Sequence, residues 1–297
     1  MRMPVFLKKN ATWMIGLIAI LAVIIIPLTL LRPQASEALD NPAAKVPTRV
    51  PETDHTHLLQ GPYASGPEVT QACLKCHPDS ATQFMATTHW TWESAPVIAA
   101  WRGEMVTIGK KNQINNFCIS AQGNENKCMS CHAGYGWEDD TFDFADPLKV
   151  DCLVCHADRS LYGKGDYGYP LEEVDLVAAA RSVGRPTREN CGFCHYDGGG
   201  GNNVKHGDMG SDLNFPSENL DVHMGGLNLL CIDCHTGSAH VIKGRLLADN
   251  LTIAHDEQVQ CTDCHSGEPH EDQRVNAHTA SVASQTCHIP AIAVKNP

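Results

Sequence analysis

The longest apolar run of the chain lies near its N-terminus. Three basic side chains precede a stretch without charged residues from residue 11 to residue 31. About 20 apolar residues can cross a bilayer as a helix, whereas the apolar region of a cleaved signal peptide is usually shorter. Residues 1–38 are therefore predicted to be an N-terminal transmembrane anchor. A cleaved signal peptide is the alternative, because Ser-Glu-Ala at 36–38 has the small-x-small pattern of a cleavage site. Because the basic residues precede the helix, the remainder is expected on the far side of the membrane.

A proline-rich polar segment follows. Residues 39–70 contain five prolines and few large apolar side chains, which predicts a stiff, extended linker. Residues 71–297 hold only short apolar runs, and the clearest helical pattern covers residues 171–183, with Gly184 and Pro186 as its stop. We expect this region to be mostly α and irregular, with short helices, long loops and almost no sheet.

Six Cys-x-x-Cys-His motifs dominate residues 71–297. They comprise Cys73, Cys76 and His77; Cys128, Cys131 and His132; Cys152, Cys155 and His156; Cys191, Cys194 and His195; Cys231, Cys234 and His235; and Cys261, Cys264 and His265. Two thiols at this spacing add to the vinyl groups of one porphyrin, and the adjacent imidazole then ligates the iron. Structural zinc sites also use paired Cys-x-x-Cys units, but they need no histidine after the second cysteine. The repeated histidine favours six covalently bound haems c.

Composition supports this interpretation. Of the 14 cysteines, only Cys118 and Cys287 lie outside the motifs. Covalent haem attachment normally takes place outside the cytoplasm, so the chain is expected in the periplasm, anchored to the inner membrane. Residues 71–297 are too few to build a separate polypeptide core around every haem, so stacked haems are expected to form the core. The formal net charge of -12 argues against nucleic acid as a partner.

Low-spin electron-transfer haems need a second axial ligand, and the chain has ten histidines outside the motifs. The pool of candidate distal ligands is His89, His206, His223, His240, His255, His270 and His278. Spacing alone does not pair them with individual haems.

A degenerate seventh motif lies close to residue 297. It keeps Cys287 and His288, but Ser284 replaces the first cysteine. One thioether can hold a haem, although attachment normally uses both thiols. We therefore expect a free Cys287 and six haems, with a seventh haem at Cys287 and His288 as the alternative.

Several strings in order resemble the octahaem tetrathionate reductase family of multihaem cytochromes c. These strings are Ala-Cys-Leu-Lys-Cys-His-Pro at 72–78, Asn-Asn-Phe-Cys-Ile at 115–119, Cys-His-Ala-Gly-Tyr-Gly-Trp at 131–137, the glycine-rich stretch at 198–208, and Cys-His-Ile-Pro at 287–290. The resemblance runs from about residue 55 to residue 290. This family has eight haems, whereas here the seventh motif is broken and an eighth is absent, so the chain is expected to be a fragment or a shortened form.

The resemblance implies a particular active site. In this family the second haem has a lysine amine in place of the distal histidine, and substrate reacts there. By position, that lysine is Lys205, and Cys118 is similar to the family's active-site cysteine. Asn202 occupies the position of an active-site aspartate, so one acid is missing. Lys110 and Lys111 remain competing candidates, since burial beside a cationic metal centre could lower the pKa of any of these amines enough for ligation.

Two functions remain open. The first is a periplasmic reductase that passes electrons from a quinol-linked or periplasmic donor to the Lys205-ligated haem and reduces tetrathionate, nitrite or hydroxylamine. Lys205 would control access to that haem, and Cys118 would contact the substrate. The second is an electron-transfer cytochrome without a substrate of its own, which relays electrons between the membrane quinol pool and periplasmic partners.

Overall fold

The computed structural model describes residues 13, 16–17, 19–26, 41–93, 96–99, 101–112, 120–196, 202, 209–244 and 258–288. Within these ranges, no helix is both long enough and apolar enough to cross a membrane. The predicted anchor falls only partly on described residues and remains a prediction. The glycine run at 198–201 lies outside them.

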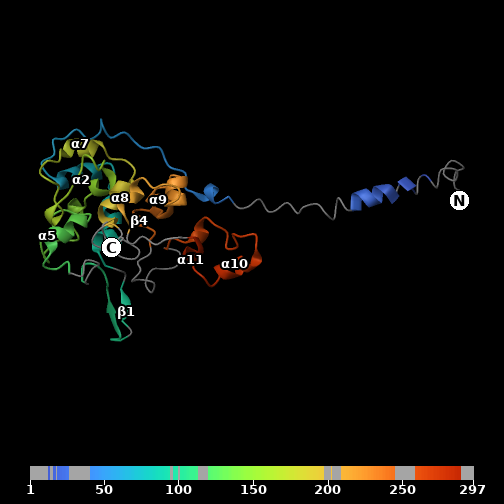
Figure 1. Cartoon of the computed structure of the whole chain (residues 1–297). Coiled ribbons are helices and arrows are strands. Elements are labelled where there is room, and N and C mark those ends of the chain that lie inside the picture. Colours follow the sequence, from blue (N-terminus) through green and yellow to red (C-terminus); the bar gives the residue numbers. More distant parts are fainter. Residues whose placement is uncertain are drawn as a thin grey trace, which may run out of the picture.

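Short helices joined by irregular segments make up most of the described chain (Figure 1). The α-helices are α2 (Gly66–Leu74), α3 (Ser80–Met85), α4 (Thr88–Thr91), α5 (Glu125–Cys128), α6 (Leu153–His156), α7 (Leu176–Arg181), α8 (Arg188–His195), α9 (Cys231–Cys234), α10 (Gln273–Thr279) and α11 (Gln285–His288). Other helical turns, of 3-10 type except η6, which is a π-helix, are η1 (Pro42–Lys45), η2 (Met129–Cys131), η3 (Pro147–Lys149), η4 (Asp166–Gly168), η5 (Ser211–Asn214), η6 (Val222–Gly226) and η8 (Cys261–Asp263). The mostly α and irregular fold is thus confirmed.

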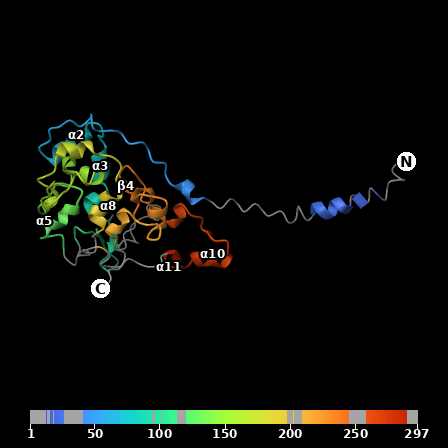
Figure 2. The ribbon, with the colours of Figure 1, turned by 45° about the horizontal axis from the view of Figure 1, so that its top comes forward.

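Sheet structure among the described residues is limited to two antiparallel hairpins. Strands β1 (Val97–Ala99) and β2 (Glu104–Val106) pair with Ile98 opposite Met105. Strands β3 (Gly237–Ser238) and β4 (Val241–Ile242) pair with Ser238 opposite Val241. The β1–β2 hairpin projects from the body of the molecule, whereas α2 and α7 lie side by side at one end (Figure 1). Helices α10 and α11 lie together at an edge away from α2 (Figure 2).

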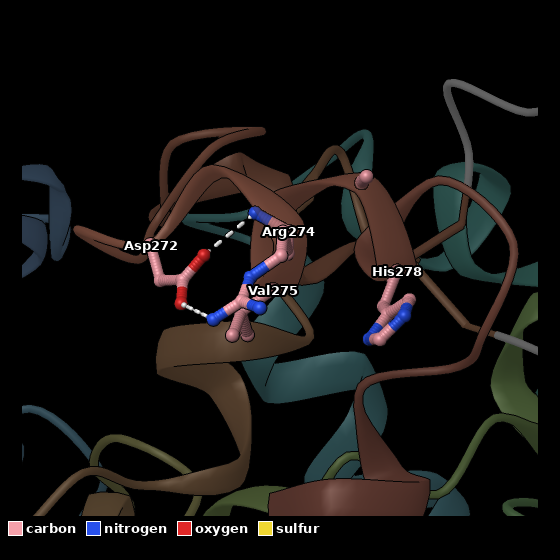
Figure 3. A pocket seen from close by; sticks show the side chains of 5 residues that line it. Asp272, Arg274, Val275 and His278 are labelled. Carbon is pink, nitrogen blue, oxygen red and sulfur yellow. Dashed lines mark hydrogen bonds and ion pairs between the residues drawn. The ribbon is translucent and has the colours of Figure 1, made fainter.

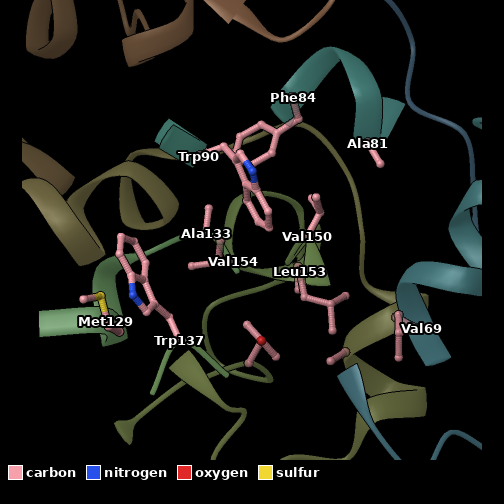
Figure 4. Close-up of a cluster of buried hydrophobic side chains, with 14 of the residues drawn as sticks. Val69, Ala81, Phe84, Trp90, Met129, Ala133, Trp137, Val150, Leu153 and Val154 are labelled. Atoms are coloured by element: carbon pink, nitrogen blue, oxygen red, sulfur yellow. The ribbon is translucent and has the colours of Figure 1, made fainter. Parts of the chain in front are cut away.

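A cluster of buried side chains packs around the first three haem motifs. Trp90, Met129 and Leu153 belong to this cluster and are at most 1% exposed (Figure 4). Cysteines of all three motifs pack against it. The expectation that haems form the core is therefore incomplete, because this end of the molecule also has a core of protein side chains. Haem-motif residues and apolar side chains share one interior.

The helix predicted over residues 171–183 is shorter in the structure. Helix α7 begins at Leu176, because the Asp175 carboxylate accepts hydrogen bonds from the backbone N–H groups of Val177 and Ala178. An aspartate at this position caps a helix and favours an extended backbone for itself. The preceding Leu171 instead donates its N–H to the Gly163 carbonyl. A single capping carboxylate therefore set the start of the helix.

Part of the predicted linker contacts the haem-binding region. Arg49 lies 2.6 Å from the carboxylate of Asp233, inside the fifth motif, and also donates to the Asn228 carbonyl. Burial by itself would raise the pKa of Asp233, but the Arg49 guanidinium and the Leu230 N–H stabilise its charged form and lower the pKa below the ordinary value. The linker is thus attached to the fifth haem motif by a charged contact.

We expect Arg49→Met to lower the free energy of unfolding by about 1 to 2 kcal/mol at pH 7, because a carboxylate only 4% exposed loses its cation. Since the folded-state pKa of Asp233 is depressed, this contribution exists above its ordinary pKa and disappears as the pH falls through the folded value. The difference in urea midpoint between variant and wild type should therefore be larger at pH 7 than at pH 3. The matched control is Arg274→Met, which removes an exposed pair with Asp272 and should change neither midpoint.

Candidate haem-binding sites

The haem motifs fold into one recurring helical turn. In the first, third, fifth and sixth motifs, the histidine N–H donates to the carbonyl of the first cysteine over 2.8–3.1 Å. Residues i, i+3 and i+4 of a helical turn share one face, so we expect both thiols and the imidazole of a motif to lie on the same side of the backbone. The local sequence thus forms an attachment site without help from the rest of the fold.

Two motif histidines are held in the tautomer that metal ligation requires. Nδ1 of His156 lies 2.9 Å from the Gly184 carbonyl, and Nδ1 of His235 lies 2.8 Å from the Lys243 carbonyl. An imidazole that donates its Nδ1–H to a carbonyl presents the lone pair of Nε2, which is the arrangement common around protein-bound metals. Both residues therefore fit an iron at Nε2.

Three histidine pairs face each other at a spacing that suits one iron. The ring centroids of His89 and His195 are 6.3 Å apart, those of His223 and His265 are 6.0 Å apart, and those of His270 and His288 are 5.7 Å apart. A metal–imidazole bond is about 2 Å long and the ring centroid lies about 1 Å behind the nitrogen, so two axial imidazoles put their centroids about 6 Å apart. The structure thus supplies pairings that sequence spacing left open.

Four histidines gather around the first and third motifs. His240 lies close enough to His156 and His77 for their charges to interact, and His55 lies near His156. The buried Nδ1 of His55 has no hydrogen-bond partner among the described residues. Four imidazoles match the needs of two bis-histidine haems. The sequence analysis left His55 outside the pool of candidate ligands, and only its histidine-rich neighbourhood, Asp-His-Thr-His at 54–57, could have indicated it.

A strained hairpin presents His240. The two residues between β3 and β4, Ala239 and His240, have φ values of 51° and 65°. Such two-residue turns favour glycine and asparagine, and each other residue in this conformation costs about 1 kcal/mol or more. The His240 Nδ1 lies 3.3 Å from Oε1 of Gln83, which again leaves Nε2 available. Strain at a residue with its ring held in place is typical of a functional position.

His132 of the second motif has different surroundings. It is fully buried among aromatic rings, and its ring centroid is 4.7 Å from that of Trp137 and 5.1 Å from that of Trp90. A side chain at Gly134 would come within 2.8 Å of both His132 and Trp90, so only glycine lets this box close. Burial and, to a smaller extent, the charge of Lys164 lower the pKa of His132 to about 3, although the hydrogen bond to the Trp90 carbonyl opposes this shift. The imidazole is therefore neutral, as a metal ligand must be.

The ring nitrogens of His132 also differ from those of the other motifs. Nε2 lies 2.8 Å from the Trp90 carbonyl, whereas the buried Nδ1 lacks a hydrogen-bond partner within the described chain. Ligation through Nε2 requires the ring to leave the Trp90 carbonyl. Among the described residues, the rings that neighbour His132 belong to tryptophan and phenylalanine side chains. None of them is a second histidine.

A buried charged network lies behind His132. The Lys164 ammonium donates to the His132 carbonyl at 2.5 Å, to the Gly134 carbonyl at 3.0 Å and to the Asp151 carboxylate at 2.8 Å. Both charged side chains are 0% exposed. Tyr135 and Tyr162 donate their hydroxyl groups to the same carboxylate, and burial, together with the charge of Asp151, raises the pKa of both phenols. This network fixes the backbone that holds the second motif, and the sequence analysis did not identify it.

Cysteines of different motifs meet in pairs. The thiols of Cys73 and Cys152, of Cys131 and Cys194, and of Cys191 and Cys231 lie close enough to shift each other's pKa. The Cys194 thiol donates to the backbone carbonyl of Cys131 at 3.4 Å. The neighbouring thiol lowers the pKa of Cys131 to about 6 and that of Cys231 to about 7.

These contacts define which motifs are neighbours. The first adjoins the third, and the fourth adjoins both the second and the fifth. Cys155 of the third motif also lies near both cysteines of the fourth, and Cys264 of the sixth lies near Cys234 of the fifth. All six motifs therefore form one connected network that branches at the fourth.

The structure only partly describes the active site implied by the family resemblance. Lys205 and Cys118 lie outside the described residues, as do the candidate ligands His206 and His255. Asn202 is exposed, and its side-chain amide exchanges two hydrogen bonds with Ser211, at 2.8 and 2.9 Å.

The competing lysines have distinct surroundings. Lys110 lies over the Trp92 ring, near enough to Cys131 to affect its pKa. Lys111 pairs with Glu93 at 3.5 Å and lies over the Phe144 ring. Both lysines are therefore close to the aromatic residues around His132.

Comparisons with known proteins identify some that are similar to this chain. The family model of cytochrome c554 and c-prime matches residues 72–157. The octaheme cytochrome c from Shewanella oneidensis is 44% identical and superposes with a TM-score of 0.71 over 80% of this chain. The chain spans 53% of that protein. An uncharacterized protein from Archaeoglobus fulgidus is 25% identical over an alignment of 238 positions, which covers 63% of this chain and 79% of that protein. With its recurring motif turns and opposed imidazoles, the chain is a multihaem cytochrome c that binds haem c covalently.

Proposed function

We propose that the protein is a periplasmic multihaem reductase whose substrate reacts at the haem of the second motif. The observation that carries this proposal is the setting of His132. His195 and His265 each face a second histidine, whereas the rings around His132 in the described chain are aromatic residues of other types. A haem without a second histidine can exchange its remaining axial position, and this is what a substrate needs.

Burial of His132 supports the same assignment. Trp90, Trp137 and Phe142 exclude water from its side of the site, so a small anion has to approach the iron from the opposite face. The haem would supply Lewis-acid and one-electron redox chemistry at that face. Lys205, assigned by resemblance, would hold or release a proton there, and Cys118 would contact the substrate. Tetrathionate, nitrite and hydroxylamine are the substrates that the resemblance suggests.

The connected motifs support delivery of electrons to this haem. Cys194 of the fourth motif meets Cys131 of the second, and the fourth motif also adjoins the third and fifth. Thioether bonds attach the edges of the porphyrins, so neighbouring thiols bring porphyrin edges close together. Electrons that enter at the first or the sixth motif can thus reach the second through the fourth. A quinol-linked or periplasmic protein would be the donor, with the N-terminal segment as the membrane anchor.

The same network favours a second candidate function, that of an electron relay without a substrate. The two functions differ in ligand binding. We expect cyanide or nitrite, added to the oxidised holoprotein, to change the absorption and paramagnetic resonance spectra of a single haem. A viologen-linked assay with tetrathionate, nitrite and hydroxylamine should then identify a reducible substrate. Spectra that no ligand alters, together with inactivity toward all three compounds, would favour the relay.

A further inference from the structure

The degenerate seventh motif has the same local fold as the intact ones. The His288 N–H donates to the Ser284 carbonyl at 3.0 Å, and the Cys287 N–H donates to the same oxygen at 3.1 Å. In the first motif, the corresponding bonds from His77 and Cys76 to Cys73 are 3.0 and 3.1 Å long. Loss of the first thiol has therefore left the attachment turn intact, and Cys287 and His288 occupy its second and third positions.

A second imidazole faces this turn. His270 and His288 have ring centroids 5.7 Å apart and planes 19° apart. That separation is close to the 6.0 and 6.3 Å of the His223–His265 and His89–His195 pairs, both of which contain a histidine from an intact motif. The rings are nearly parallel, and both this orientation and this separation suit two imidazoles on opposite sides of one iron.

The tautomer of His270 is also fixed for ligation. Its Nδ1 lies 3.3 Å from Oδ1 of Asn276, and the same oxygen accepts the His270 N–H at 2.9 Å. The Asn276 side-chain NH₂ in turn donates to the His270 carbonyl at 2.7 Å. One asparagine on α10 thus holds both the backbone and the ring, which leaves Nε2 as the free lone pair. His156, His235 and His240 are held in the same way by carbonyl oxygens.

We propose that Cys287, His288 and His270 hold a seventh haem through a single thioether bond, in place of the vacant site and free thiol that the sequence favoured. In the attachment step, the S–H bond of Cys287 and the π bond of one vinyl group break. A bond forms from sulfur to the vinyl carbon next to the porphyrin ring, and the thiol hydrogen ends on the terminal carbon. This addition needs no oxidant, and the other vinyl group, beside Ser284, stays unreacted. Cys287 and His288 are exposed, so a porphyrin can reach them.

The haem count of the matured holoprotein tests this proposal independently of any enzymatic activity. Intact mass should exceed the mass of the polypeptide by seven haems, and Cys287→Ser should reduce the increment to six under denaturing conditions. In alkaline pyridine, the wild-type absorption band should contain a minor component at longer wavelength, since one haem keeps a vinyl group. Ser284→Cys should remove that component and keep seven haems. A wild-type count of six, or a count that Cys287→Ser leaves unchanged, would overturn the proposal.

A matched pair of variants tests the distal ligand. His270→Met should keep seven haems but change the low-spin spectrum of one of them. His278, which lies on the neighbouring helix α10 with the Asp272–Arg274 pair (Figure 3), belongs to the pool of candidate distal ligands and is no control. The control is His57→Met, because His57 is exposed and lies outside both the motifs and that pool. It should leave every haem spectrum unchanged. Equal effects of the two substitutions, or none from His270→Met, would exclude His270 as the ligand.

Discussion

Replacing Lys164 with methionine should lower the free energy of unfolding by about 3 to 5 kcal/mol, the cost of leaving one member of a buried ion pair unpaired. The Asp151 carboxylate is 0% exposed and would lose the cation 2.8 Å away. The backbone carbonyls of His132 and Gly134 would lose the same donor. Urea unfolding of the holoprotein, followed by far-UV circular dichroism, measures the change.

Lys127→Met provides the matched control for this prediction. Lys127 pairs with Asp166 at 2.7 Å, nearly the distance in the buried pair, but the two side chains are 79% and 54% exposed. Water and salt screen such a pair, so its removal should leave the urea midpoint nearly unchanged. If the two variants lose equal stability, the buried network does not stabilise the second haem motif as we describe.

Replacing Lys205 with methionine should change the spectrum of one haem and lower the dye-linked reductase rate at least about tenfold. The proposed amine would ligate the second haem when neutral and would carry a proton once released, and proton transfer by a placed side chain typically contributes this much or more. Absorption and paramagnetic resonance spectra of the oxidised protein measure the ligand change. Steady-state assays with the reduced viologen measure the rate.

The other two lysines serve as controls for Lys205. Lys110 lies over Trp92, and Lys111 pairs with Glu93, so both are near the same haem motif. Lys110→Met and Lys111→Met should leave the haem spectra and the reductase rate nearly unchanged. A spectral change from Lys110→Met alone would transfer the ligand role to Lys110. If none of the three substitutions alters a spectrum, the electron relay becomes the better assignment.

Local sequence was sufficient to predict the cofactor and the type of fold. Each Cys-x-x-Cys-His motif contains both thiols and one ligand within five residues, and its helical turn forms from its own backbone bonds, as at His77 and Cys73. Glycine, proline and the close spacing of motifs likewise predicted short helices with almost no sheet. The start of α7 was misplaced, because a helical pattern indicates where a helix can run, whereas the Asp175 cap decides where it begins.

Contacts between segments that are far apart in the sequence determined which histidines face each other and which motifs are neighbours. The pairing of His89 with His195, of His223 with His265 and of His270 with His288 joins residues from separate segments, and nothing in their spacing encodes it. Likewise, the first motif adjoins the third through Cys73 and Cys152, and the fourth adjoins the second.

The sequence by itself determined that the chain carries haem c. It also determined which two thiols and which first imidazole serve each haem, since these three groups lie within five residues of one another. Only the tertiary structure decided that His89 lies opposite His195 and His223 opposite His265, which motifs are neighbours, and where Lys164 lies. Ligation across an iron and burial of a charge depend on distances of a few ångströms between segments, and the packing of the whole chain sets those distances.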